Sequence, residues 1–169
     1  MCLSSISSCE AQNQKKTGKK KKEEKLLQSI PLLKVKANVS GDCDSDIWKY
    51  VYNPSRLKLI NKCISVTGVI EESSANDDGD HHMLLKLDSG QEGLLTNMNV
   101  NKKQGNLVIE AVCANNTTLK KVGTTCNGYT NKIQIPKLGA HVKVTGSLVN
   151  DTHNGWNEIH PITKIEIIK

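Results

Sequence analysis

The stretch Ile64-Ser-Val-Thr-Gly-Val-Ile70 indicates the fold class of this chain. Apolar residues stand at alternate positions, and a strand points successive side chains to opposite faces, so one face of the segment is apolar. Gly68 interrupts that face, as expected of a strongly bent strand. Because aliphatic and β-branched residues are abundant and the chain contains no Phe, the sequence predicts an all-β domain with an aliphatic core.

The rest of the chain supplies the other elements of such a domain. Asp44-Ser-Asp46 is typical of the start of a short helix, which Asn53-Pro54 ends. Strand patterns extend from Leu57 and recur near residues 82–88, 94–95, 107–113, 142–148 and 159–167, with a long loop at 114–132. This arrangement predicts a five-stranded Greek-key barrel like the oligonucleotide/oligosaccharide-binding (OB) fold. A β-sandwich is the alternative.

The positive charge is concentrated in the N-terminal segment. Residues 1–25 hold seven Lys and three Glu, a formal charge of +4 out of +6 for the whole chain. Such composition is typical of a disordered tail, and it is weak evidence for nucleic-acid binding. We therefore expect a disordered basic tail at residues 1–40 and an OB-like barrel domain at residues 41–169.

The first ten residues suggest a lipid anchor. Ser-Ile-Ser-Ser-Cys9, followed by the Lys-rich spacer, is similar to the end of a bacterial lipoprotein signal whose beginning would lie upstream. Cys9 is then the expected lipidation site. The alternative is an ordinary N-terminus with two incidental cysteines. No segment approaches the roughly 20 apolar residues that span a bilayer.

Four cysteines fall in the expected domain without the short spacing of zinc or redox motifs. Pairing of Cys43 with Cys63 would join the short helix to the first strand, and pairing of Cys113 with Cys126 would close a short loop. Disulfides indicate an oxidising compartment, so we expect an extracytoplasmic protein, secreted or lipid-anchored at the cell surface. The alternative is four free thiols in a cytosolic protein.

One polar cluster is a candidate site. Glu158 and His160 are two residues apart on the last strand and share a face, opposite Ile159. Barrel closure would bring them towards the start of the second strand, where carboxylates and imidazoles recur. The predicted ligand-binding residues are Asp78, Asp80, His82, Trp156, Glu158 and His160. Of these, His82, Glu158 and His160 are the candidate ligands of a divalent metal. The alternative is turn chemistry and mutual hydrogen bonding.

Two motifs also resemble a known family. Asp78-Gly-Asp-His-His82 and Gly155-Trp-Asn-Glu-Ile-His-Pro161 are similar to the DGDxH and GWxEIHP motifs of an uncharacterised family of small exported microbial proteins. The resemblance spans residues 42–169, includes the four cysteines of the domain, and implies a barrel-like fold and export, but no activity. The family pattern has His directly before Gly-Trp, whereas this chain has Asn154 there and His153 one place earlier. That departure puts a role of His153 in doubt.

These features favour a binding or interaction module over an enzyme. Single-stranded nucleic-acid binding is the first alternative, although this chain has few aromatic residues for base stacking. A metal-dependent hydrolase that uses the Asp/His/Glu cluster is the second. A nuclease is disfavoured because Arg56, the only Arg, precedes the first strand. We expect a monomer, with membrane contact only through a lipid anchor or the basic tail.

Overall fold

The computed structural model describes residues 43–169. The expected disordered tail at residues 1–40 and the expected lipidation of Cys9 lie outside the described residues. Within residues 43–169 there is no helix whose length and apolar character would let it cross a membrane.

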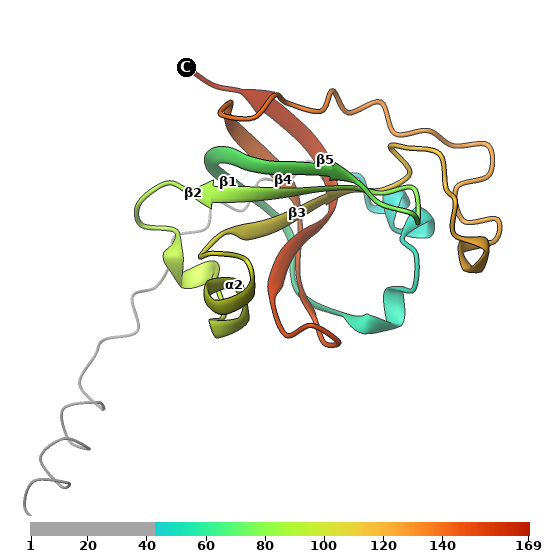
Figure 1. Cartoon of the computed structure of the whole chain (residues 1–169), viewed down its shortest axis with the longest axis horizontal. Helices are drawn as coiled ribbons and strands as arrows, with labels where there is room; N and C mark the ends of the chain where they lie inside the picture. The colour runs from blue at the N-terminus through green and yellow to red at the C-terminus, as the bar shows by residue number, and fades with distance from the viewer. Residues whose placement is uncertain (1–42) are drawn as a thin grey trace, which may run out of the picture. The chain divides into compact units, whose positions relative to one another are not determined.

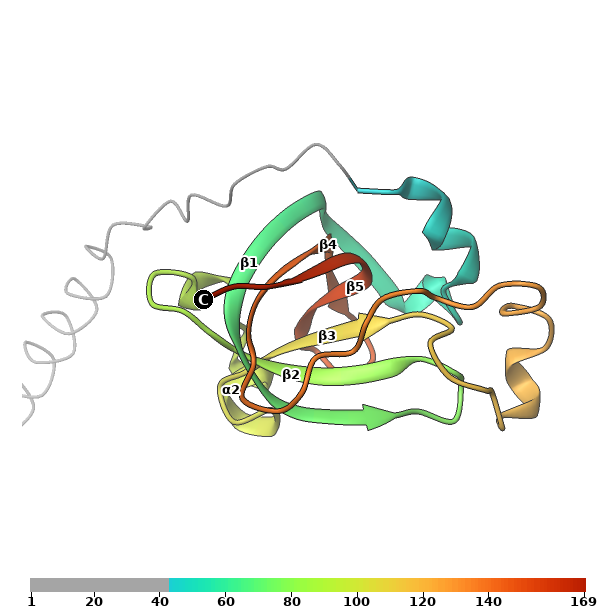
Figure 2. The ribbon, with the colours of Figure 1, turned by 90° about the horizontal axis from the view of Figure 1, so that it is seen from above.

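Five strands make up most of the regular structure (Figure 1). β1 pairs with β4 along its first part and with β2 along its second, and β2 pairs with β3. β3 runs parallel to β5, and β5 is antiparallel to β4, so the order β1-β2-β3-β5-β4 returns to β1 (Figure 2). The strands are β1 Leu57–Ala75, β2 His81–Leu87, β3 Leu107–Ala111, β4 His141–Asp151 and β5 Asn157–Ile167. The mostly-β class with five strands is therefore confirmed.

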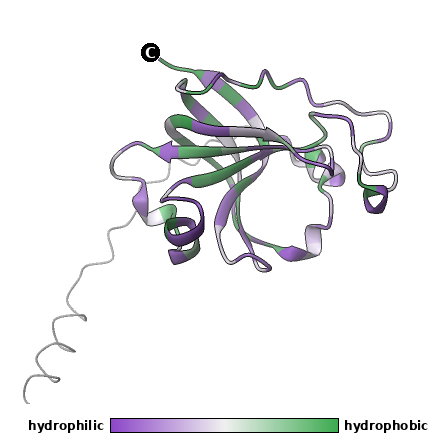
Figure 3. Cartoon of the chain, in the orientation of Figure 1, coloured by the Kyte–Doolittle hydropathy of each residue, from purple (hydrophilic) through white to green (hydrophobic). Residues whose placement is uncertain are grey.

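Aliphatic side chains fill the space that the strands enclose. They come from alternate positions, such as Ile64 and Val66 of β1, and all five strands contribute to this core. Figure 3 shows the corresponding alternation of apolar and polar residues along the strands. At Gly68 an added Cβ would collide with the backbone carbonyl of Lys86, so glycine lets β1 bend closely over β2.

A short helical segment leads into β1. The 3₁₀-helix η1 spans Ser45–Tyr50, and its N-cap Asp44 accepts a hydrogen bond from the backbone N–H of Asp46. A second 3₁₀ turn, η2, spans Pro54–Arg56. The predicted short helix is thus present in the tighter 3₁₀ form. Both predicted disulfides are present, Cys43–Cys63 beside η1 and Cys113–Cys126 after β3.

The middle of the chain differs from the prediction. The expected strand near residues 94–95 is wrong: Glu92–Leu94 forms the 3₁₀ turn η3, and Asn97–Lys102 forms the helix α2. The physical reason is a capping box in which Thr96 and Asn99 satisfy each other's backbone N–H groups. The long loop is confirmed, apart from the 3₁₀ turn η4 at Lys120–Val122.

Candidate ligand-binding cleft and buried carboxylate–histidine cluster

Strand register places ionisable side chains in one row on the outer face of β2, β3 and β5. Ile109 of β3 lies beside Ile159 of β5, and both belong to the core. Their neighbours in sequence, Glu110 and His160, therefore lie next to each other on the opposite face. His82 of β2 is the direct cross-strand partner of Glu110. Three strands thus bring one carboxylate and two imidazoles together.

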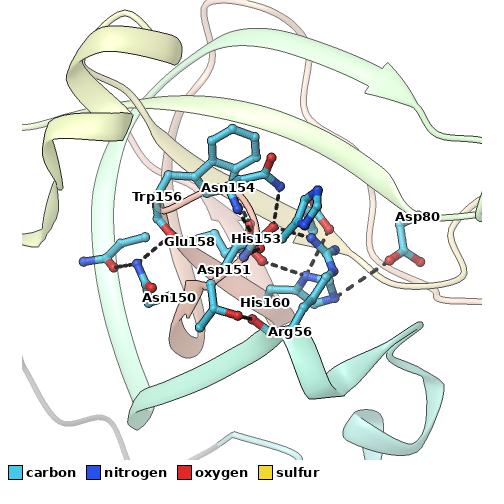
Figure 4. Close-up of polar contacts among 12 residues, drawn as sticks. Arg56, Asp80, Asn150, Asp151, His153, Asn154, Trp156, Glu158 and His160 are labelled. Carbon is cyan, nitrogen blue, oxygen red and sulfur yellow. Dashed lines mark hydrogen bonds and ion pairs between the residues drawn. The ribbon is translucent and has the colours of Figure 1, made fainter.

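His160 lies at the β5 end of this row and is fully buried. Figure 4 shows its ring among acidic side chains. Its Nδ1 lies 3.0 Å from Oε2 of Glu110 and 3.2 Å from Oε1 of Glu158. Its Nε2 points to the other side, 3.8 Å from Oδ2 of Asp80, and has no hydrogen-bond partner among residues 43–169. One ring nitrogen is therefore held by carboxylates, while the other is unpaired.

Glu158 fixes the orientation of its neighbours. Its Oε2 accepts a hydrogen bond of 2.9 Å from Nε1–H of Trp156, and its Oε1 faces Nδ1 of His160. Both carboxylate oxygens thus have partners although the side chain is fully buried. Glu158 consequently links the indole ring in the β4–β5 turn to the buried imidazole.

Asp80 approaches the cluster from the end of the β1–β2 turn. Its Oδ1 accepts a hydrogen bond of 2.9 Å from the backbone N–H of Cys113, which fixes the carboxylate. Its backbone carbonyl accepts from the side-chain amide of Asn115. Asp78 stabilises this turn, because its Oδ1 accepts a hydrogen bond from the backbone N–H of Asp80. The Asp78-Gly-Asp80 sequence thus forms a turn that aims the second Asp at His160.

The carboxylates and the imidazole change each other's pKa. Burial alone would lower the pKa of His160, but the charges of Glu110 and Glu158 raise it to about 10. Burial raises the pKa of Asp80 to about 7, although the charge of His160 opposes this shift. Burial would raise the pKa of Glu110, but the charge of His160, the hydrogen bond to His160 and the charges of His82 and Arg56 together hold it at about 2. Burial also lowers the pKa of His82, which is therefore neutral near pH 7.

Arg56 and Asp151 form a second ion pair beside this cluster. Nη1 of Arg56 contacts Oδ2 of Asp151, whose side chain is fully buried. The same carboxylate accepts hydrogen bonds from the backbone N–H groups of His153 and Asn154 and from the amide of Asn154. Burial would lower the pKa of Arg56, but Asp151 and neighbouring carboxylates raise it. The ion pair therefore joins η2 to the β4–β5 turn that carries Trp156.

A cleft of about 600 Å³ lies over the row of side chains. Glu110 contributes to its lining from β3, and the indole of Trp156 contributes from the β4–β5 turn. The ammonium of Lys103 sits 4.2 Å from the centre of that indole. The remaining lining is polar and comes from η2, β1, the β1–β2 turn, β2 and the β4–β5 turn. It includes Arg56, Glu72, Asn76, Asp78, His82 and Asn154.

The structure brings most of the predicted site residues together, but it changes the candidate metal set. Asp80, Glu110 and His160 each offer a ligand atom within 4.8 Å of the others, whereas His82 and Glu158 are not in that group. The two carboxylate oxygens of Glu158 face Trp156 and His160 instead. His82 instead lines the cleft. His153 contributes only its backbone N–H to the contact with Asp151.

Three residues of the site were missed by the sequence reasoning. Glu110 interrupts the apolar run Leu107-Val-Ile-Glu-Ala-Val-Cys113, and a lone carboxylate within a buried strand is a signal that could have found it. Arg56 precedes the first strand, as predicted, but η2 also brings its side chain to Asp151, and the sequence reasoning did not foresee this contact. The third, Asp151, is buried, and its sequence context resembles an ordinary turn.

The chain matches no model of a known protein family, and no curated protein is significantly similar to it. The resemblance to a family of exported proteins therefore stays a prediction.

Proposed function

We propose that residues 43–169 are an extracytoplasmic binding module of the OB type, and that its cleft holds a hydroxyl-rich ligand of the oligosaccharide class. The observation that carries the proposal is the position of the cleft. OB folds bind ligands on the face of strands 2 and 3, between the β1–β2 and β4–β5 loops. Here His82 and Glu110 lie on β2 and β3, Asp78 on the first loop, and Trp156 on the second.

The chemistry of the lining favours hydroxyl groups. It offers carboxylates and amide oxygens as acceptors, and guanidinium, ammonium and amide groups as donors. A sugar ring presents hydroxyls that both donate and accept, together with apolar patches of C–H groups. The half-buried indole of Trp156 supplies a flat apolar surface for such a patch. One side of the cleft thus suits ring faces, and the rest suits hydroxyl groups.

The charge of the cleft is unfavourable for nucleic acid. Among the groups that line it, the cations Arg56 and Lys103 face the carboxylates of Glu72, Asp78 and Glu110. The buried carboxylates beneath the cleft add further negative charge. Nucleic-acid-binding grooves on this fold combine positive charge with several aromatic platforms, whereas this lining has only Trp156 and Tyr52. The nucleic-acid alternative is therefore less well supported.

The two disulfides support the proposed location. Disulfides such as Cys43–Cys63 and Cys113–Cys126 are typical of proteins in oxidising environments. Secretion, or anchoring through a lipid on Cys9, is compatible with this chemistry.

The test is a binding screen of the disulfide-bonded protein against an array of neutral and acidic oligosaccharides, with oligothymidylate as the competing probe. Hits are then quantified by calorimetry. Substitution of Lys103 or Trp156 by Ala should weaken oligosaccharide binding by about tenfold or more, equal to ~1.4 kcal/mol. Lys132 lines a separate pocket, so Lys132→Ala is the matched control and should leave oligosaccharide binding unchanged. Salt-sensitive binding of oligothymidylate without any oligosaccharide binding would replace this proposal by the nucleic-acid alternative.

A further inference from the structure

We propose that Asp80, Glu110 and His160 bind one divalent ion of the first transition row, with Zn²⁺ as the representative ion, directly beneath the cleft. This inference does not depend on which ligand the cleft holds. The three residues come from the β1–β2 turn, β3 and β5, and their ligand atoms all lie within 4.8 Å of one another. Two carboxylates and one imidazole form a mixed oxygen and nitrogen set that suits such ions.

The unpaired nitrogen of His160 is the observation that distinguishes this cluster from an ordinary group of acids. The side chain is fully buried, and within the described part of the chain its Nε2 has no hydrogen-bond partner. Nε2 faces Oδ2 of Asp80 at 3.8 Å, which is too long for a hydrogen bond. A shared metal ion would account for this separation, because two ligand atoms about 2.1 Å from one ion stand well apart. Buried polar atoms without a partner are uncommon in proteins.

The surroundings of His160 match those of metal-bound histidines. Such a histidine usually donates its other ring N–H to a carboxylate, which fixes the tautomer and the orientation of the ring. Nδ1 of His160 lies 3.2 Å from Glu158 and 3.0 Å from one oxygen of Glu110, and Trp156 in turn holds the second oxygen of Glu158. The backbone N–H of Cys113 holds Oδ1 of Asp80, which leaves Oδ2 directed towards Nε2. Imidazole and carboxylate are thus both prepositioned by their own partners.

Charge balance also favours a cation. The cluster contains the carboxylates of Asp80, Glu110 and Glu158, all nearly or fully buried. Protonated His160 would be the one cation within the cluster, since Arg56 is paired with Asp151. Unbalanced buried negative charge is costly, and a divalent ion offsets more of it than a single imidazolium does.

The same chain contains a natural control. His141 and Asp88 form an imidazole–carboxylate pair at 2.9 Å, but these side chains are 38% and 40% exposed, and no third acidic ligand joins them in the described residues. Asp88→Asn therefore removes a carboxylate from a histidine without touching the proposed site. The equivalent changes at the proposed site are Asp80→Asn and Glu110→Gln, which preserve side-chain size.

The experiment uses the full disulfide-bonded chain without a polyhistidine tag, treated with iodoacetamide to block any thiol of Cys2 and Cys9. After removal of metal by a chelator, ZnCl₂ is titrated by calorimetry, and CoCl₂ is titrated while the visible absorption is recorded. We expect about one ion per chain. Binding should weaken by well over a hundredfold in Asp80→Asn and Glu110→Gln, and by about 10–100-fold in Glu158→Gln. Asp88→Asn should bind as the unmodified chain does.

Circular dichroism and the disulfide count establish whether each variant is folded. A variant that fails to fold is replaced by Glu110→Asp, which moves the ligand oxygen without removing it. The inference is overturned if the folded parent chain binds no Zn²⁺ or Co²⁺, or if binding survives in both Asp80→Asn and Glu110→Gln. It is equally overturned if Asp88→Asn abolishes binding, since the ion would then lie at the surface pair. Each of these results is independent of oligosaccharide binding, so the two proposals fail separately.

Discussion

The ion pair between Arg56 and Asp151 allows a quantitative test of how the cleft is held together. We consider Arg56→Met and Asp151→Asn, separately and combined. The pair joins η2 to the β4–β5 turn, and through that turn it positions Trp156. Loss of the pair should therefore weaken both the fold and the cleft.

The magnitude follows from the burial of the two partners. Breaking a fully buried ion pair costs about 3–5 kcal/mol. In Asp151→Asn the remaining charge is that of Arg56, whose side chain is 23% exposed and still reaches water, so we expect a loss of ~2–4 kcal/mol. In Arg56→Met the carboxylate keeps its hydrogen bonds from His153 and Asn154. That loss should be ~1–3 kcal/mol. The double variant should show a coupling energy of ~1–3 kcal/mol.

The assay is urea unfolding of the parent, both single variants and the double variant, followed by circular dichroism with disulfides intact. The matched control is the surface pair of Lys164 and Glu166, which lie 2.8 Å apart with 63% and 40% of their side chains exposed. Its coupling energy should be below ~0.5 kcal/mol, because water and salt screen exposed charges. A coupling energy between Arg56 and Asp151 no larger than that of this control would refute the reasoning.

Three further predictions concern the barrel, its loop and its pH response. Gly146→Ala should cost ~3 kcal/mol or more, because the added Cβ would come within 2.5 Å of a backbone carbonyl on β5; thermal unfolding measures this loss. Replacing both Cys113 and Cys126 by Ser should cost ~3 kcal/mol in urea unfolding, since the bridge spans 13 residues. In metal-free protein, burial would raise the pKa of Glu110, but the charge and hydrogen bond of His160, together with the charges of His82 and Arg56, lower it from 4.5 to about 2. The resulting stability is present above pH 4.5 and lost as the pH falls towards 2; the acid limb of a stability–pH profile should be shallower in Glu110→Gln.

The strands were largely predictable because their signal is local. Alternation of apolar residues identified β1, β2, β4 and β5, and Gly68 marked the bend. The cysteine pairing also followed from position along the chain. The middle region was misjudged because Leu94 and Leu95 look like a strand, whereas the capping box of Thr96 and Asn99 starts a helix there. A short apolar run does not by itself distinguish a strand from a turn when a helix-capping motif follows it.

The site was predictable only in part because it depends on pairing between distant strands. The two-residue spacing of Glu158 and His160 was sufficient to place them on one face. The parallel pairing of β3 with β5, which brings Glu110 beside His160, has no local signature. The same holds for Arg56, whose position depends on the course of η2 before the first strand. Predicting which residues meet across a sheet therefore requires the register of its strands, which one sequence does not provide.

Burying the ionisable groups of the cluster costs free energy of folding, and this cost is itself an argument that the cluster binds a ligand. Glu110, Glu158 and His160 are buried, and replacing buried ionic groups with apolar side chains is often neutral or stabilising. Aliphatic residues at these buried positions would therefore stabilise the fold about as well as the acidic groups do. The unpaired Nε2 of His160 adds a further cost. Both costs are reduced when a cation binds between Asp80 and His160, which also stiffens the floor beneath the cleft. Ion and cleft are then parts of one binding face on the outside of the barrel.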